Sequence, residues 1–142
     1  MKHREANIHM AVAGFLRSNY PDVIFRTDFA AGVKMTMGQA VRHKRLQSGR
    51  AYPDLFIAQP NRRGNQVACG LFLELKSEGT RVYLKNGELT ADKHIREQAE
   101  VLAQLDKLGY RAKFAVGFDE AITLIKQYLG GANDNEKTNQ AF

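Results

Sequence analysis

One continuous apolar run constrains the fold of this chain more than any other feature. Residues 67–73, which include one glycine, contain no polar side chain, and the run ends in Glu74-Leu75-Lys76. An apolar run without alternation is typical of a strand that is covered on both faces. We therefore predict one strand over residues 66–76, with structure packed on both sides of it. At seven residues, the run is well below the roughly 20 that a membrane-spanning helix needs, so no membrane partner is expected.

Periodicity predicts the other elements of the fold. Apolar residues that recur every three or four positions indicate a helix over 4–17 and another that begins after Thr90 or Asp92 and ends before Gly109. A last amphipathic helix follows Asp119, which we expect to cap it. Short apolar stretches indicate strands over 23–29, 53–58 and 111–118, a short helix is expected around 39–46, and turns are expected at 61–65 and 86–87.

The main elements follow one another in the order α-β-β-β-α-β-α. This order is typical of an α/β (α+β) fold in which a mixed central sheet of about four strands is flanked by helices. The 142 residues suit one domain, which we place at 1–129. The tail at 130–142 has no apolar period and is expected to be disordered.

Cysteine usage and the N-terminus indicate the compartment. Cys69 lies inside the apolar run, and the chain has no second cysteine for an internal disulfide. We expect Cys69 to be a small buried apolar residue that binds no zinc. The first residues are charged where a secretory signal would be apolar, so the expected location is the cytoplasm.

Two acidic residues stand at the ends of predicted strands. Asp54 begins one strand and Glu74 ends another, so both lie at the same end of the sheet if these strands are antiparallel neighbours. Two adjacent carboxylates repel unless a cation lies between them, and hard oxygen ligands favour magnesium or manganese. Strand alternation places Lys76 on the same face as Glu74, beside that cation.

Two further polar residues fall on the apolar faces of helices. Glu5 shares its face with Ile8 and Val12, and Gln98 lies between Ile95 and Leu102. A carboxylate that faces a core is costly unless it is paired or binds a metal, and an inward amide needs hydrogen-bond partners. His9 is the helical neighbour of Glu5.

Together these groups are the equipment of metal-dependent phosphodiester hydrolysis, in which a metal activates water and a cation stabilises charge on the phosphate. A structural interpretation stays open for each residue. Asp54 can be a turn-former after Pro53, and Glu74 with Lys76 an exposed pair at a strand end. Glu5 can be an acid favoured by the helix dipole, and Gln98 a satisfied core amide.

The net charge of +6 is confined to one part of the chain. Concentrated positive charge beside carboxylates fits a polyanion with a bound cation, although charge alone does not separate DNA from RNA. A solvated basic loop is the alternative. The candidate nucleic-acid contacts between residues 34 and 63 are Lys34, Arg42, Lys44, Arg45, Arg50, Arg62 and Arg63.

These motifs also resemble a known group of proteins. The Pro-Asp-Leu at 53–55, the Glu-Leu-Lys at 74–76, a glutamate in the first helix and a glutamine in a later one are similar to the PD-(D/E)xK nuclease superfamily. The resemblance is closest to the VRR-NUC family of virus-type replication and repair nucleases, and it covers most of residues 5–129. The stretches that carry it are SGRAYPDLFIA, GLFLELKSEG, REQAEVLAQLDKLGYRA and AVGFDEAI.

The resemblance implies a restriction-endonuclease-like core and a role for each site residue. Glu5, Asp54, Glu74 and the carbonyl of Leu75 would be ligands of Mg²⁺ or Mn²⁺. Lys76 would be the catalytic lysine and Gln98 the supporting residue of the family's motif, so that Glu5, Asp54, Glu74, Lys76 and Gln98 all belong to the catalytic set.

The resemblance further implies a homodimeric, structure-selective DNA endonuclease of phage or bacterial replication, recombination or repair. Its substrate would be branched, Holliday-type or duplex DNA, and a helicase is an implied type of partner. The additional turn at 61–66 and the long loop after Lys76 depart from the family pattern and bear on substrate choice. The alternative function is a non-catalytic DNA-binding module of a repair or packaging complex.

Overall fold

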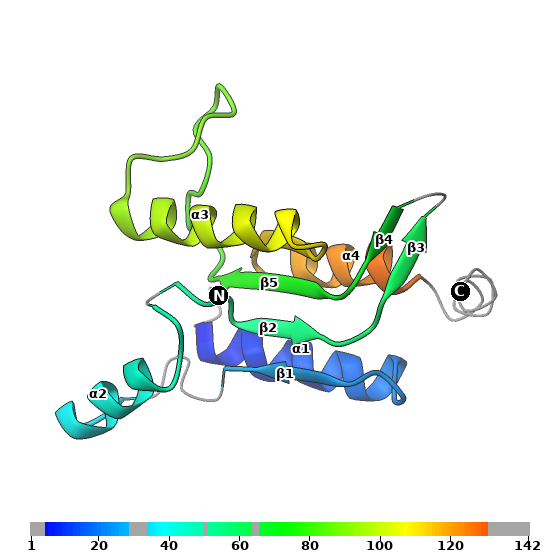
Figure 1. Cartoon of the computed structure of the whole chain (residues 1–142), viewed down its shortest axis with the longest axis horizontal. Helices are drawn as coiled ribbons and strands as arrows, with labels where there is room; N and C mark the ends of the chain where they lie inside the picture. The colour runs from blue at the N-terminus through cyan, green and yellow to red at the C-terminus, as the bar shows by residue number, and fades with distance from the viewer. Residues whose placement is uncertain (1–4, 29–33, 50, 64–65, 131–142) are drawn as a thin grey trace.

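The chain forms a four-stranded sheet with helices on both faces (Figure 1). A computed structural model describes residues 5–28, 34–49, 51–63 and 66–130. The predicted tail at 130–142 lies outside the described residues, apart from Gly130. Within the described ranges, no helix has the length and apolar character needed to cross a membrane.

The sheet is mixed, as the order of elements predicts. Strands β1 (Phe25–Thr27), β2 (Leu55–Ile57), β5 (Leu71–Lys76) and β6 (Arg111–Val116) lie in the order β1-β2-β5-β6. The pairs β1-β2 and β2-β5 are antiparallel, and β5-β6 is parallel. Strand β5 is therefore internal, and its residues from 71 to 75 are all buried.

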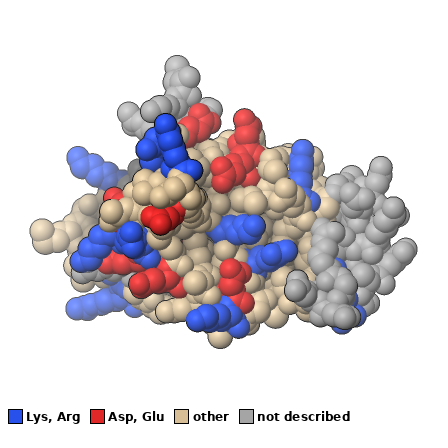
Figure 2. Space-filling view, turned by 90° about the horizontal axis from the view of Figure 1, so that it is seen from above, with Lys and Arg blue, Asp and Glu red and all other residues tan. Residues whose placement is uncertain are grey.

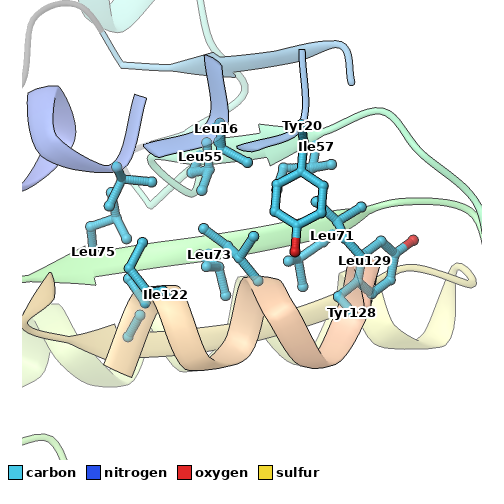
Figure 3. Packing of buried hydrophobic residues seen from close by; sticks show 14 of the residues in the cluster. Leu16, Tyr20, Leu55, Ile57, Leu71, Leu73, Leu75, Ile122, Tyr128 and Leu129 are labelled. Atoms are coloured by element: carbon cyan, nitrogen blue, oxygen red, sulfur yellow. The ribbon is translucent and has the colours of Figure 1, made fainter. Parts of the chain in front are cut away.

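Helices α1 (Glu5–Asn19) and α4 (Phe118–Leu129) cover one face of the sheet. Their apolar residues pack against alternate residues of the two central strands, as Figure 3 shows for Leu16 and Ile122 around Leu73. Burying each such side chain contributes about 1.5–3 kcal/mol. This layer explains why Leu71, Leu73 and Leu75, on one face of β5, are apolar.

Helix α3 (Lys93–Lys107) covers the other face. Ile95 and Leu102 of this helix pack with Phe72 of β5 and Phe114 of β6. Successive side chains of a strand point to opposite faces, so Glu74 lies on the same face as Phe72, beneath α3.

The predicted strand at 66–76 is wrong in one respect, because the structure divides it at Gly70. A Cβ atom there would lie 2.7 Å from Phe56 Cε2 and 2.9 Å from the carbonyl oxygen of Ile57, so the chain passes too close to β2 for any side chain. The residues before Gly70 form β4 (Gln66–Ala68), which pairs with β3 (Asn61–Arg63) in a separate two-stranded ribbon. Cys69 is consequently exposed, and its predicted burial is also wrong.

The predicted short helix is present as α2 (Met37–Arg45). Thr36 caps it in a reciprocal capping box with Gln39, whose side-chain oxygen lies 3.0 Å from the Thr36 amide nitrogen. No residue of α2 is buried, and Figure 1 shows the helix set apart from the sheet. His43 links it to the segment after β1, with its Nε2 at 3.4 Å from Asp28 Oδ1.

The ends of the other helices agree only in part with the sequence. Asp92 caps α3 by accepting a hydrogen bond from the Ile95 amide at 3.0 Å, as predicted. Asp119 does not cap α4, because Gly117 occupies the N-cap position and the helix already begins at Phe118. The predicted turn at 86–87 is confirmed by an isolated antiparallel bridge between Tyr83 and Leu89.

Candidate active site

The antiparallel pairing of β2 and β5 brings the two acidic residues together. Leu55 lies opposite Leu73, so the residue before β2, Asp54, comes opposite Glu74. Residues in that relationship have Cβ atoms about 4.5–5.5 Å apart. The expectation that the two carboxylates share one end of the sheet is confirmed.

The side chain of Asp54 continues the ladder where the strand β2 ends. Its Oδ2 accepts a hydrogen bond of 3.0 Å from the Leu75 amide. The same register places Pro53 opposite Leu75, and proline has no N–H with which to bind the Leu75 carbonyl. Since the N–H and C=O of one strand residue point to the same side, this carbonyl faces the side where Asp54 lies.

Glu74 is held by a hydrogen bond from helix α3. It is 3% exposed, and its Oε1 accepts a hydrogen bond of 2.8 Å from Nε2 of Gln98, itself 4% exposed. The inward position that periodicity predicts for Gln98 is therefore confirmed. Among the described residues, Gln98 Oε1 is buried without a hydrogen-bond partner.

His94 belongs to this site, although it was not among the residues predicted from the sequence. Its Nε2 lies 3.2 Å from Gln98 Nε2. An amide nitrogen carries two hydrogens and accepts none, so the contact fits a His94 ring whose Nε2 is the acceptor. His94 precedes Gln98 by one helical turn, and that spacing was the available signal.

The acidic pair and Lys76 line one open cleft of about 650 Å³. Lys76 is half-buried and follows Glu74 on the same face of β5. His43 and Lys44 of α2 line the cleft from the other side. A second cavity, of about 510 Å³, lies around Asn61 and Arg111 and contains none of the predicted catalytic residues.

The donor atoms fit a small hard cation. Asp54, Glu74 and the Leu75 carbonyl supply oxygen, and Mg²⁺ is commonly bound by one or two carboxylates with water and substrate phosphate in its other positions. Glu5 is the first residue of α1, and its side chain lies outside the described part of the chain. No three His, Cys, Asp or Glu side chains form a metal-binding group within the ranges described.

The structure divides the predicted basic segment between two ends of the molecule. Arg42, Lys44 and Arg45 lie in the last turn of α2, where Lys44 lines the cleft, and Lys34 is exposed shortly before that helix. Arg62 is on the β3-β4 ribbon, which extends from the opposite end of the sheet (Figure 1). Two positions lie outside the described residues, Arg50 entirely and Arg63 in its side chain.

In the described part of the face that Figure 2 shows, the basic side chains form no single patch. Figure 2 shows basic and acidic side chains interspersed over the described part of this face. The positive charge of residues 34–63 is therefore distributed by the fold, and α2 carries the part that lies nearest to the two carboxylates.

The fold and site define a mixed α/β domain that places two carboxylates and a lysine at one end of its central strand. A solved structure described as "VRR_NUC domain protein" has the same fold, with a TM-score of 0.55 and 24% sequence identity over 89% of this chain and 88% of that chain. This similarity confirms the fold expected from the motifs. No protein-family model matches the sequence, and no curated protein matches it.

Proposed function

We propose that the protein is a divalent-metal-dependent DNA endonuclease that hydrolyses phosphodiester bonds. The observation that carries the proposal is the register that sets Asp54 opposite Glu74, with Lys76 following on the same face. Glu74 is buried and Asp54 is half-buried, so two charged carboxylates at this spacing are costly, and a cation between them would remove the repulsion.

Each group of the site has a distinct proposed role. Asp54, Glu74 and the Leu75 carbonyl hold Mg²⁺ or Mn²⁺, and Glu5 is proposed as a further ligand. The bound metal would lower the pKa of a water molecule and polarise the phosphate. The Lys76 ammonium stabilises negative charge that develops on the phosphate oxygens. Gln98 fixes the carboxylate of Glu74 through the 2.8 Å hydrogen bond.

Helix α2 is proposed to hold the nucleic acid against the cleft. Its last turn carries three cationic side chains, and none of its residues is buried, so its surface is available to a partner. Phosphate contacts by such side chains position a nucleic acid without reading its sequence. Lys34, Arg50, Arg62 and Arg63 are proposed as further contacts, of which only Lys34 precedes α2 directly.

The finer parts of the proposal rest on the resemblance in the motifs. They are a preference for branched or Holliday-type junctions, a homodimer, a helicase as partner, and a role in DNA replication, recombination or repair in the cytoplasm of a bacterium or a phage-infected cell.

A cleavage panel tests the proposed function. Synthetic junction, flap, single-stranded and linear DNA, with an RNA duplex for comparison, would be incubated with Mg²⁺, Mn²⁺ or EDTA. We expect metal-dependent cleavage of DNA that Lys76→Ala abolishes and Lys113→Ala, at an exposed position of β6, retains. Cleavage in EDTA, or full activity of Lys76→Ala, would overturn the proposal. A gel shift without product under any divalent ion would favour the non-catalytic DNA-binding module.

A further inference from the structure

His9 is a buried polar side chain for which the proposed reaction has so far supplied no role. It is 4% exposed and lies on the sheet-facing side of α1. Ile8 and Val12, on the same side of the helix, belong to the hydrophobic core. Neither ring nitrogen of His9 has a hydrogen-bond partner within the described ranges. Burying a polar group without a partner costs about 1–3 kcal/mol.

Among the side chains that the structure describes, one acidic group lies close to the ring of His9. Its Nε2 lies 3.8 Å from Asp54 Oδ2, which is beyond hydrogen-bonding distance but within reach of a small side-chain movement. Hydrogen bonds of this kind in metal-free or substrate-free sites are often long and tighten when the site is loaded.

The contacts of Asp54 divide its two oxygens. Oδ2 already accepts the amide of Leu75 at 3.0 Å and is also the oxygen that faces His9. Oδ1 is then the oxygen that the protein leaves for a cation. A second donor on Oδ2 would fix the rotation of the carboxylate and so hold Oδ1 in one orientation.

We propose that His9 is a positioning residue that donates from Nε2 to Asp54 Oδ2 and orients Asp54 as a metal ligand. The inference rests on the proposed function, because it assigns a supporting group to the same site. Partners that orient metal ligands typically contribute about 10–100-fold to metal affinity. His9 would orient Asp54 from α1, on one face of the sheet, whereas Gln98 holds Glu74 from α3, on the other face.

A structural role and a positioning role predict different results for His9→Leu. Leucine has a similar volume and no nitrogen to satisfy, so the metal-free variant should be as stable as the wild type or more stable. If His9 positions Asp54, the dissociation constant for Mn²⁺ should nevertheless rise about 10-fold or more. The measurements are thermal unfolding without metal and Mn²⁺ titration by calorimetry, and neither requires catalysis.

Two amide variants test the position of the donor. The side-chain nitrogen of His9→Gln reaches about as far as Nε2, whereas that of His9→Asn is shorter, so Mn²⁺ affinity should be retained in the first and reduced in the second. This comparison also holds if His9→Leu does not fold. Asn61→Leu is the matched control, because Asn61 is a buried polar residue that lines the other cavity, and its loss should alter stability without altering Mn²⁺ affinity.

The outcomes separate the two proposals. Wild-type Mn²⁺ affinity in His9→Leu, or equal affinity of the Gln and Asn variants, would overturn the role of His9 and leave the proposed nuclease intact. Absence of Mn²⁺ binding by the wild-type protein would overturn the proposed function and the inference with it.

Discussion

Gln98 of α3 donates a hydrogen bond of 2.8 Å to Glu74 of β5, and both side chains are buried. The bond joins the helical layer to the end of the central strand, at the point where that strand carries its only acidic residue. The position of this carboxylate therefore depends on how α3 packs.

Gln98→Leu should destabilise the protein and weaken metal binding. It leaves Glu74 without one of its hydrogen bonds, and the loss of a bond to a buried charged group costs about 1.5–3 kcal/mol. Urea unfolding would measure the stability, and calorimetric titration the Mn²⁺ affinity. Gln104→Leu, at an exposed position of the same helix, is the control that should change neither. Equal effects of the two variants would contradict the role given to Gln98.

Pro53→Ala should weaken metal binding although it changes none of the acidic residues that we propose as ligands. The variant introduces an N–H opposite Leu75, where it can bind the carbonyl that we propose as a metal ligand. We expect a correctly folded protein with lower Mn²⁺ affinity and slower cleavage. Pro60→Ala, at an exposed position, should leave both unchanged. Unaltered Mn²⁺ affinity in Pro53→Ala would exclude the Leu75 carbonyl as a ligand.

Removal of positive charge from α2 should weaken DNA binding without unfolding the protein. Arg42→Ala combined with Lys44→Ala removes two phosphate contacts, so the slope of log affinity against log salt concentration should fall by about 2. No core packing is lost, because α2 has no buried residue. Arg62→Ala, at the far end of the sheet, removes one of the further contacts proposed and should lower this slope by about 1. Lys113→Ala, at an exposed position of β6, is the control and should leave the slope unchanged. A larger effect of Arg62→Ala would move the nucleic acid to the β3-β4 ribbon.

Strand alternation and helical periodicity were enough to predict the elements that carry the site. The burial of Gln98 follows from the helical period. The meeting of Asp54 with Glu74 was predicted only if the two strands are antiparallel neighbours, and the pairing of β2 with β5 meets that condition. The break at Gly70 depends on how closely Phe56 approaches it from another strand, and no local pattern contains that information. Cys69 is exposed for the same reason.

The sequence assigned no role to either supporting histidine for a related reason, although His9 was noted as the helical neighbour of Glu5. His94 contacts Gln98 on its own helix, and His9 faces Asp54 from α1. The significance of each histidine therefore depends on the contacts that Gln98 and Asp54 make with β5. The sequence predicted one basic segment. In the fold, β2 runs between Lys44 and Arg62, so Lys44 lies at the cleft and Arg62 lies on the β3-β4 ribbon. Proximity in the sequence therefore does not place these charges on one surface.

Ionisation of Tyr128, which lies in α4, should lower the stability of the protein in alkaline solution. Burial raises the pKa of Tyr128 above its ordinary value near 10, and its hydroxyl donates to the Gln59 carbonyl at 2.5 Å. The folded state retains this proton after the unfolded state has lost it, so the stabilising contribution is complete below about pH 10 and declines as pH rises above that value. Tyr128→Phe should lose about 1 kcal/mol at neutral pH and show a shallower decline above pH 10. Chemical denaturation at a series of pH values, with exposed Tyr83→Phe as control, would measure both effects. An identical alkaline decline in Tyr128→Phe and the wild type would show that Tyr128 does not contribute to it.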